Sequence, residues 1–312
     1  MKGYRFNLRY FTGLCLFVAS HSLFAQIAVL ACEPEWAALT HALGGDQVKV
    51  YTATTAMQDP HQIQARPSLI AQARQANLLV CTGAELEIGW LPVLLRKSGN
   101  TAIQFGSPGY FMAADYVQLL DKPTRLDRSE GDVHAAGNPH IQTDPRRIAK
   151  VADQLAATLA AIDGEHATLY RERLADFRGR WQQAIQSWET RAQPLRGLNV
   201  VVYHDSWPYL SDWLGLHKVA TIEPKPGVPP SSKYLAELVA QLQGQPVGLI
   251  LRATYQDDRP ASWLAEKTGI PVLPVNQSVV DPEQPDVLFR WFDDLVAQLL
   301  DTAKTPAVKI AQ

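Results

Sequence analysis

Only three cysteines occur among the 312 residues, which excludes a fold held together by a dense set of disulfides. Cys15 lies in an apolar N-terminal segment, whereas Cys32 and Cys81 each end a short apolar run that predicts a strand. In an oxidising compartment these two cysteines either pair or stay as buried free thiols. Residues 29–32 also resemble a weak lipoprotein cleavage site, but the run 27–32 is better explained as the first strand.

Beyond the N-terminus, no apolar run is long enough to span a bilayer. Residues 1–25 have the features of a secretory signal, with three basic side chains, an apolar core at 11–19 and a small residue, Ala25, at the expected cleavage point. The apolar core is too short for a membrane anchor. We therefore expect residues 1–25 to be removed on export to the periplasm.

The chain has no excess of basic residues over acidic ones. The whole chain has 29 Lys and Arg against 31 Asp and Glu, and removal of residues 1–25 takes away three basic and no acidic residues. The remaining 26 basic and 31 acidic residues give a net charge near −5. A mildly acidic exported protein has no broad basic field for nucleic acid, so we expect no nucleic-acid partner.

Several motifs of enzymes are missing. The sequence contains no His-Glu-x-x-His and no Gly-x-Ser-x-Gly, and no glycine-rich loop that would hold a phosphate. These absences exclude the zinc proteases, the serine hydrolases and the nucleotide-binding enzymes that depend on those motifs. With 46% hydrophobic and 19% charged residues, the composition is that of a globular protein.

Short apolar runs alternate with helical patterns in both halves of the chain. Continuous apolar runs of this kind are typical of strands buried on both faces, so the pattern predicts α/β lobes with parallel sheets covered by helices. The predicted strands are 27–32, 48–51, 78–81, 198–203, 218–221, 247–251 and 271–275. A long loop is expected between residue 106 and His140.

Residues 145–192 are helical in pattern almost throughout. Residues 165–192 alone make one helix of roughly 40 Å at about 1.5 Å per residue, long enough to act as a rigid strut between two lobes. The predicted organisation is a signal peptide, a first α/β lobe, connecting helices and a second α/β lobe, with the boundaries 1–25, 26–150, 151–194 and 195–312.

Three histidines share one context. His61, His140 and His204 each follow a predicted strand or lie in a loop that leads into a helix. Ligands of parallel sheets bind beyond the carboxyl ends of the strands, and two of these histidines belong to the first lobe and one to the second. We therefore predict a metal site in the cleft between the lobes. Imidazole nitrogen suits Zn²⁺ and its neighbours.

His140 has the strongest local context of the three. It follows an Asn138-Pro139 turn and precedes a helix start, where Thr143 or Asp144 can act as the cap and a proline follows. A histidine between a rigid turn and a capped helix is positioned from both sides.

The fourth ligand is less defined. We prefer Asp281, because it follows the last predicted strand as the histidines follow theirs. His134, six residues before His140 in the same loop, is a candidate accessory ligand, and water is a further possibility. The other carboxylate candidates are Asp59, Glu85, Glu87 and Glu223.

These motifs together resemble the zinc/manganese-specific solute-binding proteins of bacterial ABC importers. The resemblance rests on Asp59-Pro60-His61, on Gly137-Asn138-Pro139-His140, on Tyr203-His204 with the residues up to Tyr209, and on Glu223-Pro224. Two features depart from that family. Residues 106–139 hold one histidine in place of a long histidine-rich loop, and residues 276–281 do not align cleanly with the acidic fourth ligand.

The resemblance implies two α/β lobes bridged by one long helix, and a monomeric receptor that hands metal to an ABC permease. Three neutral imidazoles with one carboxylate or water favour Zn²⁺ over Mn²⁺, which calls for more oxygen ligands. Because protons compete for the imidazoles, we expect affinity to fall as pH drops through about 6.5. The alternatives are a three-histidine zinc hydrolase and a two-lobed receptor for an organic solute.

Overall fold

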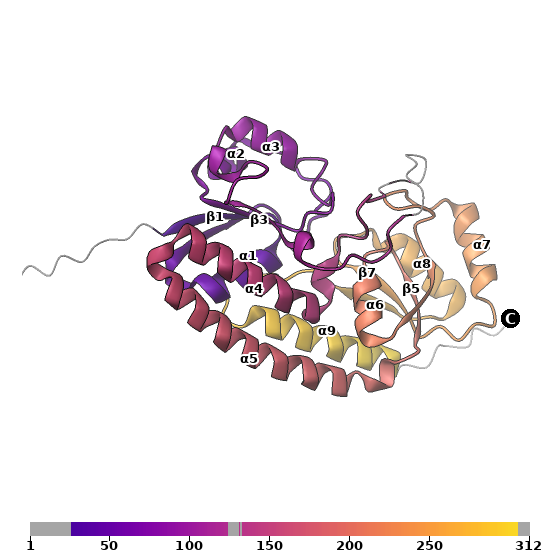
Figure 1. Cartoon of the computed structure of the whole chain (residues 1–312). Coiled ribbons are helices and arrows are strands. Elements are labelled where there is room, and N and C mark those ends of the chain that lie inside the picture. Colours follow the sequence, from indigo (N-terminus) through magenta and orange to yellow (C-terminus); the bar gives the residue numbers. More distant parts are fainter. Residues whose placement is uncertain (1–25, 124–130, 132, 305–312) are drawn as a thin grey trace, which may run out of the picture.

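Each lobe is built on a four-stranded parallel sheet, and the two sheets have the same plan (Figure 1). The computed structural model describes residues 26–123, 131 and 133–304. The first sheet has the order β2-β1-β3-β4 and the second the order β6-β5-β7-β8. The strands are β1 Ile27–Ala31, β2 Val48–Thr52, β3 Leu78–Cys81, β4 Tyr110–Met112, β5 Asn199–Val202, β6 His217–Thr221, β7 Leu249–Ala253 and β8 Val272–Val275.

Several α-helices of the described residues begin at or next to a proline. Proline lies in the first turn of α1, α2, α3, α4 and α6, where its missing N–H costs no hydrogen bond. The α-helices are α1 Pro34–Gly44, α2 Pro67–Gln75, α3 Leu91–Ser98, α4 Pro145–Ile162, α5 Ala167–Arg191, α6 Pro208–Leu214, α7 Ser232–Leu242, α8 Asp258–Thr268 and α9 Val287–Ala303.

The long helix is α5, which has 25 residues and runs with α4 and α9 beneath both lobes (Figure 1). Trp181 of α5 packs edge-on against Phe292 of α9, with the ring centroids 5.6 Å apart. Val29 of β1, Leu249 of β7 and Trp181 all belong to one buried hydrophobic cluster. The two sheets therefore share a continuous core with the strut, which confirms the predicted two-lobed α/β fold with its bridging helix.

Cys32 and Cys81 form a disulfide between the ends of β1 and β3, with their Cα atoms 4.7 Å apart. Both side chains are fully buried. Pairing is thus the alternative that the structure supports, and residues 27–31 form the first strand as predicted. The predicted signal peptide, residues 1–25, lies outside the described residues. Within the described part of the chain, no helix has both the length and the apolar character needed to cross a bilayer.

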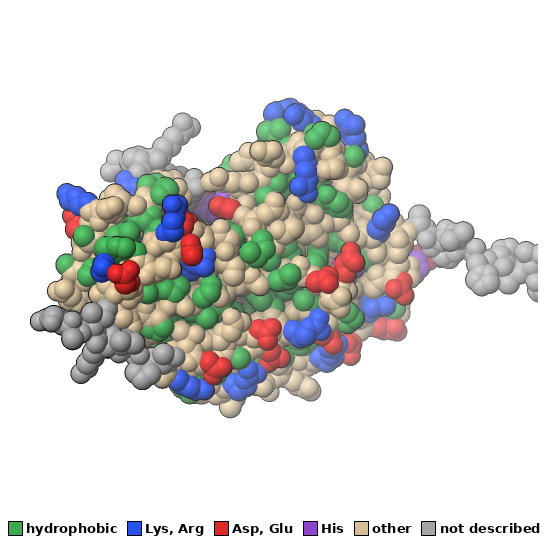
Figure 2. Space-filling model, turned by 180° about the vertical axis from the view of Figure 1, so that it is seen from behind, with side chains coloured by type: hydrophobic (Ala, Val, Ile, Leu, Met, Phe, Trp, Pro, Cys, Tyr) green, Lys and Arg blue, Asp and Glu red, His purple; other side chains and the backbone are tan. Residues whose placement is uncertain are grey.

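Strand β4 is the one strand among the described residues that the sequence does not predict. Residues 110–112 lie within the expected long loop, yet they pair in parallel with β3, with Tyr110 opposite Leu79. Three residues are too few to show a period, which explains why the pattern was missed. On the face shown in Figure 2, acidic and basic side chains of the described residues are interspersed, in agreement with the absence of a broad basic field in the sequence.

Candidate metal centre

His61 lies in the loop between β2 and α2, and its ring is held from one side. Its Nδ1 is 2.7 Å from Oδ1 of Asp59, which also accepts a hydrogen bond from the His61 amide at 3.0 Å. Trp90 fixes the same loop by donating to the carbonyl of Pro60 at 2.8 Å. The Nε2 atom of His61 is buried and has no hydrogen-bond partner. With Nδ1 taken by a carboxylate, Nε2 is the nitrogen available to a ligand.

His140 is the most buried of the three histidines, with 1% of its surface exposed. Its amide donates to Oδ1 of Asn138 at 3.0 Å, and its carbonyl accepts from the Thr143 hydroxyl at 3.0 Å. The backbone is thus fixed on both sides, as the sequence predicts. Neither ring nitrogen of His140 has a partner. A fully buried imidazole with both nitrogens unpaired indicates a site that binds something.

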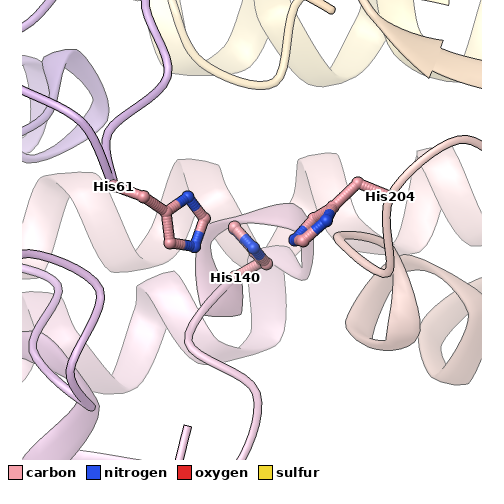
Figure 3. Close-up of side chains that lie close together, drawn as sticks. All are labelled: His61, His140 and His204. Carbon is pink, nitrogen blue, oxygen red and sulfur yellow. The ribbon is translucent and has the colours of Figure 1, made fainter. Parts of the chain in front are cut away.

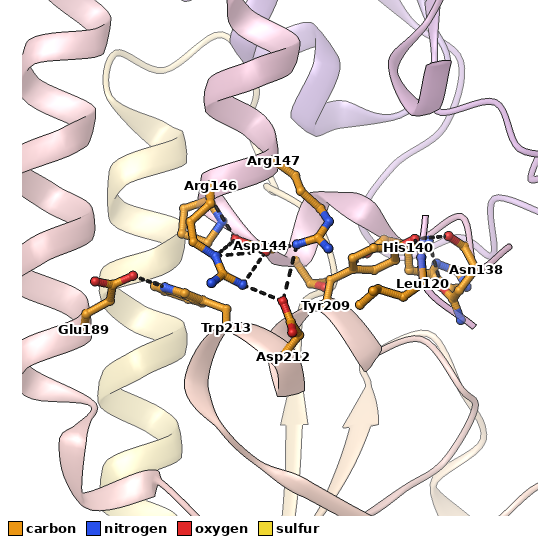
Figure 4. A network of polar contacts seen from close by, with 12 residues as sticks. Leu120, Asn138, His140, Asp144, Arg146, Arg147, Glu189, Tyr209, Asp212 and Trp213 are labelled. Atoms are coloured by element: carbon orange, nitrogen blue, oxygen red, sulfur yellow. Dashed lines mark hydrogen bonds and ion pairs between the residues drawn. The ribbon is translucent and has the colours of Figure 1, made fainter. Parts of the chain in front are cut away.

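Asp144 anchors the end of the His140 loop to the second lobe. Its side chain caps α4 by accepting from the Arg146 amide at 2.8 Å, so the cap is Asp144 and not Thr143. The buried carboxylate also forms ion pairs with Arg146 and Arg147. Arg146 reaches on to Asp212 of α6 at 2.7 Å (Figure 4). This network joins the start of α4 to the second lobe directly behind the histidine.

His204 follows β5 and brings the second lobe to the site. Its Nδ1 is 2.7 Å from Oε2 of Glu223, and the same oxygen accepts from the Gly227 amide at 3.0 Å. Glu223 belongs to the proline-rich loop after β6, so a stiff segment holds the carboxylate that orients the ring. His204 therefore repeats the arrangement of His61, in which a carboxylate occupies Nδ1.

The structure brings His61, His140 and His204 together. Each offers one ligand atom, and these atoms all lie within 4.8 Å of one another. The ring centroid of His61 is 5.3 Å from that of His140 and 5.6 Å from that of His204, and His140 and His204 are also 5.6 Å apart. Figure 3 shows the three rings converging from separate segments. Three imidazoles at this spacing could hold one metal ion.

The electrostatics of the site favour the neutral form of His140 and the ionised form of Asp59. Burial, followed by the positive charges that His61 and His204 would carry, holds the pKa of His140 well below 6.5. Burial opposes ionisation of Asp59, but its hydrogen bond with His61 holds the pKa of Asp59 below its usual value. The ring of His140 is therefore a neutral donor, and the carboxylate behind His61 is ionised, as metal binding requires.

The structure does not bring Asp281 to the histidines. Its side chain is exposed after β8 and accepts a hydrogen bond from Gln284 at 3.1 Å. The residue that turns inward after β8 is Gln277, whose Oε1 accepts from the Tyr255 hydroxyl at 2.8 Å. Asp281 is preferred from the sequence because it follows a strand, but the loop after β8 is buried only as far as Val279 and is exposed at Val280 and Asp281.

His134, the candidate accessory ligand, lies beside His61. Its ring centroid lies 5.3 Å from that of His61, and its Nε2 is buried without a partner. The available signal was its place in the same loop as His140. Of the carboxylate candidates, Asp59 and Glu223 stand behind histidines, and Glu87 accepts from the amides of Thr82 and Gly83.

Comparison with known proteins agrees with this geometry. The family described as zinc-uptake complex component A, periplasmic (ZnuA), matches residues 29–302. The manganese ABC transporter substrate-binding lipoprotein PsaA of Streptococcus pneumoniae serotype 4 is 20% identical over 252 residues, covering 79% of this chain and 78% of PsaA.

Two solved structures share the fold. The crystal structure of ZnuA has a TM-score of 0.72 at 21% identity and covers 87% of this chain and 98% of its own. FpvC of P. aeruginosa in complex with Ni²⁺ has a TM-score of 0.73 at 17% identity and covers 92% of this chain and 100% of its own. Because the family match spans most of the described residues, the chain belongs to the ZnuA family of substrate-binding receptors for metal ABC importers, which are not enzymes.

Proposed function

We propose that the protein is a periplasmic receptor that captures Zn²⁺ with His61, His140 and His204 and delivers it to the transmembrane subunit of an ABC permease. The observation that carries this proposal is the ring of His140, which is buried with both nitrogens unpaired. Burying an unpaired polar atom costs free energy, and a bound cation offsets that cost for one nitrogen.

The donor set supports Zn²⁺ as the cargo in preference to Mn²⁺. The three clustered ligands are imidazoles, and the nearest carboxylates, Asp59 and Glu223, are already hydrogen-bonded to ring nitrogens. Mn²⁺ prefers oxygen ligands, whereas imidazole suits Zn²⁺, Ni²⁺ and Cu²⁺. The names of similar proteins include zinc, manganese and nickel, so the argument for zinc rests on the residues of this chain.

Two features of the chain support the proposed location. Residues 1–25 have the pattern of a secretory signal, and the Cys32–Cys81 disulfide suits an oxidising compartment such as the periplasm. We propose that the mature receptor acts there as a monomer. Because both lobes share one core with α5, release of the metal depends on shifts of the loops that hold His61, His140 and His204 and not on wide opening of the lobes.

A competition titration with a chelator of known affinity tests the proposal. The purified receptor should bind one Zn²⁺ per chain with submicromolar affinity and should bind Mn²⁺ more weakly. His140→Ala should abolish tight binding, whereas His217→Ala, which changes an exposed histidine in β6, should not. Failure of the wild-type protein to bind zinc in the submicromolar range overturns the proposal, and tighter binding of Mn²⁺ overturns the choice of metal.

A further inference from the structure

The loop that carries His134 is held at the site from two directions. At its start, Gly131 has a φ of +84°, and an added Cβ would lie 2.3 Å from the carbonyl oxygen of Pro226 in the second lobe. One residue after His134, the amide of Ala135 donates to Oε2 of Glu85 in the first lobe at 2.7 Å. The segment that carries His134 is therefore in contact with both lobes.

The ring of His134 is presented in the same manner as those of His61 and His204. The backbone of Glu85 accepts a hydrogen bond from the ring, while Nε2 stays buried with no partner. Its centroid is 5.3 Å from that of His61, equal to the distance between His61 and His140. In the rings of His134, His61 and His204 one nitrogen has an oxygen partner and the other is left for a ligand, which is the usual arrangement of metal-bound histidine.

The carboxylates considered for the fourth position are all engaged elsewhere. Those of Asp59 and Glu223 are bonded to Nδ1 atoms, and Glu85 holds the amide of Ala135. Asp281 is exposed after β8, and Glu87 is buried against backbone amides. His134 has an unpaired ligand atom and a ring in contact with that of His61, and it lies just outside the group of three whose ligand atoms are within 4.8 Å of one another.

We propose that His134 is the fourth ligand, so that this receptor binds its cargo through four neutral imidazoles and no carboxylate. The inference rests on the proposed function and specifies its chemistry. Asp59 and Glu223 lie behind two of the rings, so two negative charges balance the divalent ion without touching it. A site of four imidazoles selects Zn²⁺, Ni²⁺ or Cu²⁺ and discriminates against Mn²⁺ and other ions that require oxygen.

X-ray absorption spectroscopy of the zinc-loaded, full-length mature protein tests the inference by counting imidazole ligands. The wild-type protein and His217→Ala should both show four nitrogen ligands with four imidazole rings. His134→Ala should show three rings and one oxygen, and should lose zinc affinity by at least the roughly 10–100-fold that loss of an outer-shell partner costs. His134→Asp should raise the affinity for Mn²⁺ relative to Zn²⁺.

The outcomes separate this inference from the proposed function. Tight zinc binding by a wild-type site of three imidazoles and one oxygen overturns the role of His134 and leaves the receptor function intact. Unchanged ligand counts and affinity in His134→Ala have the same meaning. Absence of tight zinc binding in the wild-type protein overturns both. Because the ligand count is made on the wild-type protein, the test does not depend on the folding of any variant.

Discussion

The hydroxyl of Ser278 donates a hydrogen bond to the carboxylate of Glu35, although the two residues are 243 positions apart in the chain. Glu35 is in the first turn of α1 in the first lobe, and Ser278 follows β8 of the second. Both side chains are buried, and the Oε1 atom of Glu35 has no partner. The bond joins the lobes at a point where the carboxylate is almost completely removed from water.

Replacing Glu35 should alter how stability depends on pH. Burial raises the pKa of Glu35 from 4.5 to about 7. Because the folded-state pKa lies above the unfolded value, the contribution of this group to stability is complete below about pH 4.5 and is lost as pH rises through about 7. Glu35→Gln removes that loss. The fall in melting temperature between about pH 5 and about pH 8 should therefore be smaller in Glu35→Gln than in the wild type.

The control for this prediction is Glu172→Gln, which changes an exposed carboxylate on α5. Its melting temperature should follow the wild-type curve across the same pH range. A parallel shift of the Glu35→Gln curve, with no change in its slope, would show that Glu35 is ionised throughout and would contradict the prediction.

The ion network at the start of α4 should contribute strongly to stability. Asp144 is completely buried and pairs with Arg146 and Arg147. Asp144→Asn takes away the nearer carboxylate of the largely buried Arg147 and leaves it only Asp212, at 3.7 Å. Breaking a buried pair in this way costs about 3–5 kcal/mol in the free energy of unfolding. Urea denaturation should show a loss of that order. Zinc affinity should fall as well, because the same helix start positions His140.

Asp257 provides a matched control. It also caps a helix, α8, and pairs with an arginine two residues later, Arg259, but on the surface. Solvent screens such a pair, so Asp257→Asn should cost much less stability than Asp144→Asn. Equal losses in the two variants would mean that capping, and not the buried charge, accounts for the effect.

Glu223 should tune metal affinity without touching the metal. Its carboxylate orients His204 through Nδ1 at 2.7 Å. Glu223→Gln weakens that hold and should reduce zinc affinity by about 10–100-fold. Competition titration measures the change, with Glu237→Gln, an exposed change on α7, as the control. An unchanged affinity in Glu223→Gln would show that the ring needs no carboxylate to be oriented.

Zinc affinity should fall as the pH is lowered, and the fall should occur at a lower pH than for exposed histidines, because the ligand rings are buried. Burial is the main cause that lowers the pKa of His134 to about 4 and holds the pKa of His140 well below 6.5. The positive charges that His61 and His204 would carry are the second cause. A base with a lowered pKa keeps its neutral form to lower pH, so these two rings take up protons below the reference value of about 6.5. The protons that they release per zinc bound should increase from about pH 6.5 towards about pH 4.

Calorimetry in buffers with different ionisation enthalpies counts those protons. The expected loss of affinity therefore lies at a lower pH than the sequence alone predicts, which is the pKa of an ordinary histidine. Affinity that stays constant from neutral pH to well below about pH 4 would contradict histidine ligands altogether.

The fold was largely predictable because local signals agreed with one another. Continuous apolar runs predicted the parallel strands, and prolines marked helix starts at Pro34, Pro67, Pro145 and Pro208. The two lobes followed from repetition of that alternation. Strand β4 was missed because its place in the sheet depends on pairing with β3, which a segment of three residues does not reveal.

The site was predictable only to the level of which segments meet. Residues that follow the strands of parallel sheets gather at one edge, so the meeting of His61, His140 and His204 could be foreseen. The places of Asp281 and His134 depend on the paths of irregular loops. Those paths are set by contacts far apart in sequence, such as that of Gly131 with Pro226, and no local pattern encodes them.

The common core beneath the two lobes has a consequence for how occupancy is communicated. Because the two lobes share one core, we expect the receptor to present nearly the same outline whether empty or full. We then expect a transporter to sense the cargo through the order and charge of the loops that carry the histidines. Loaded and empty receptors then differ mainly in the surface of these loops. A measurement of loop mobility should therefore distinguish them better than a measurement of molecular shape.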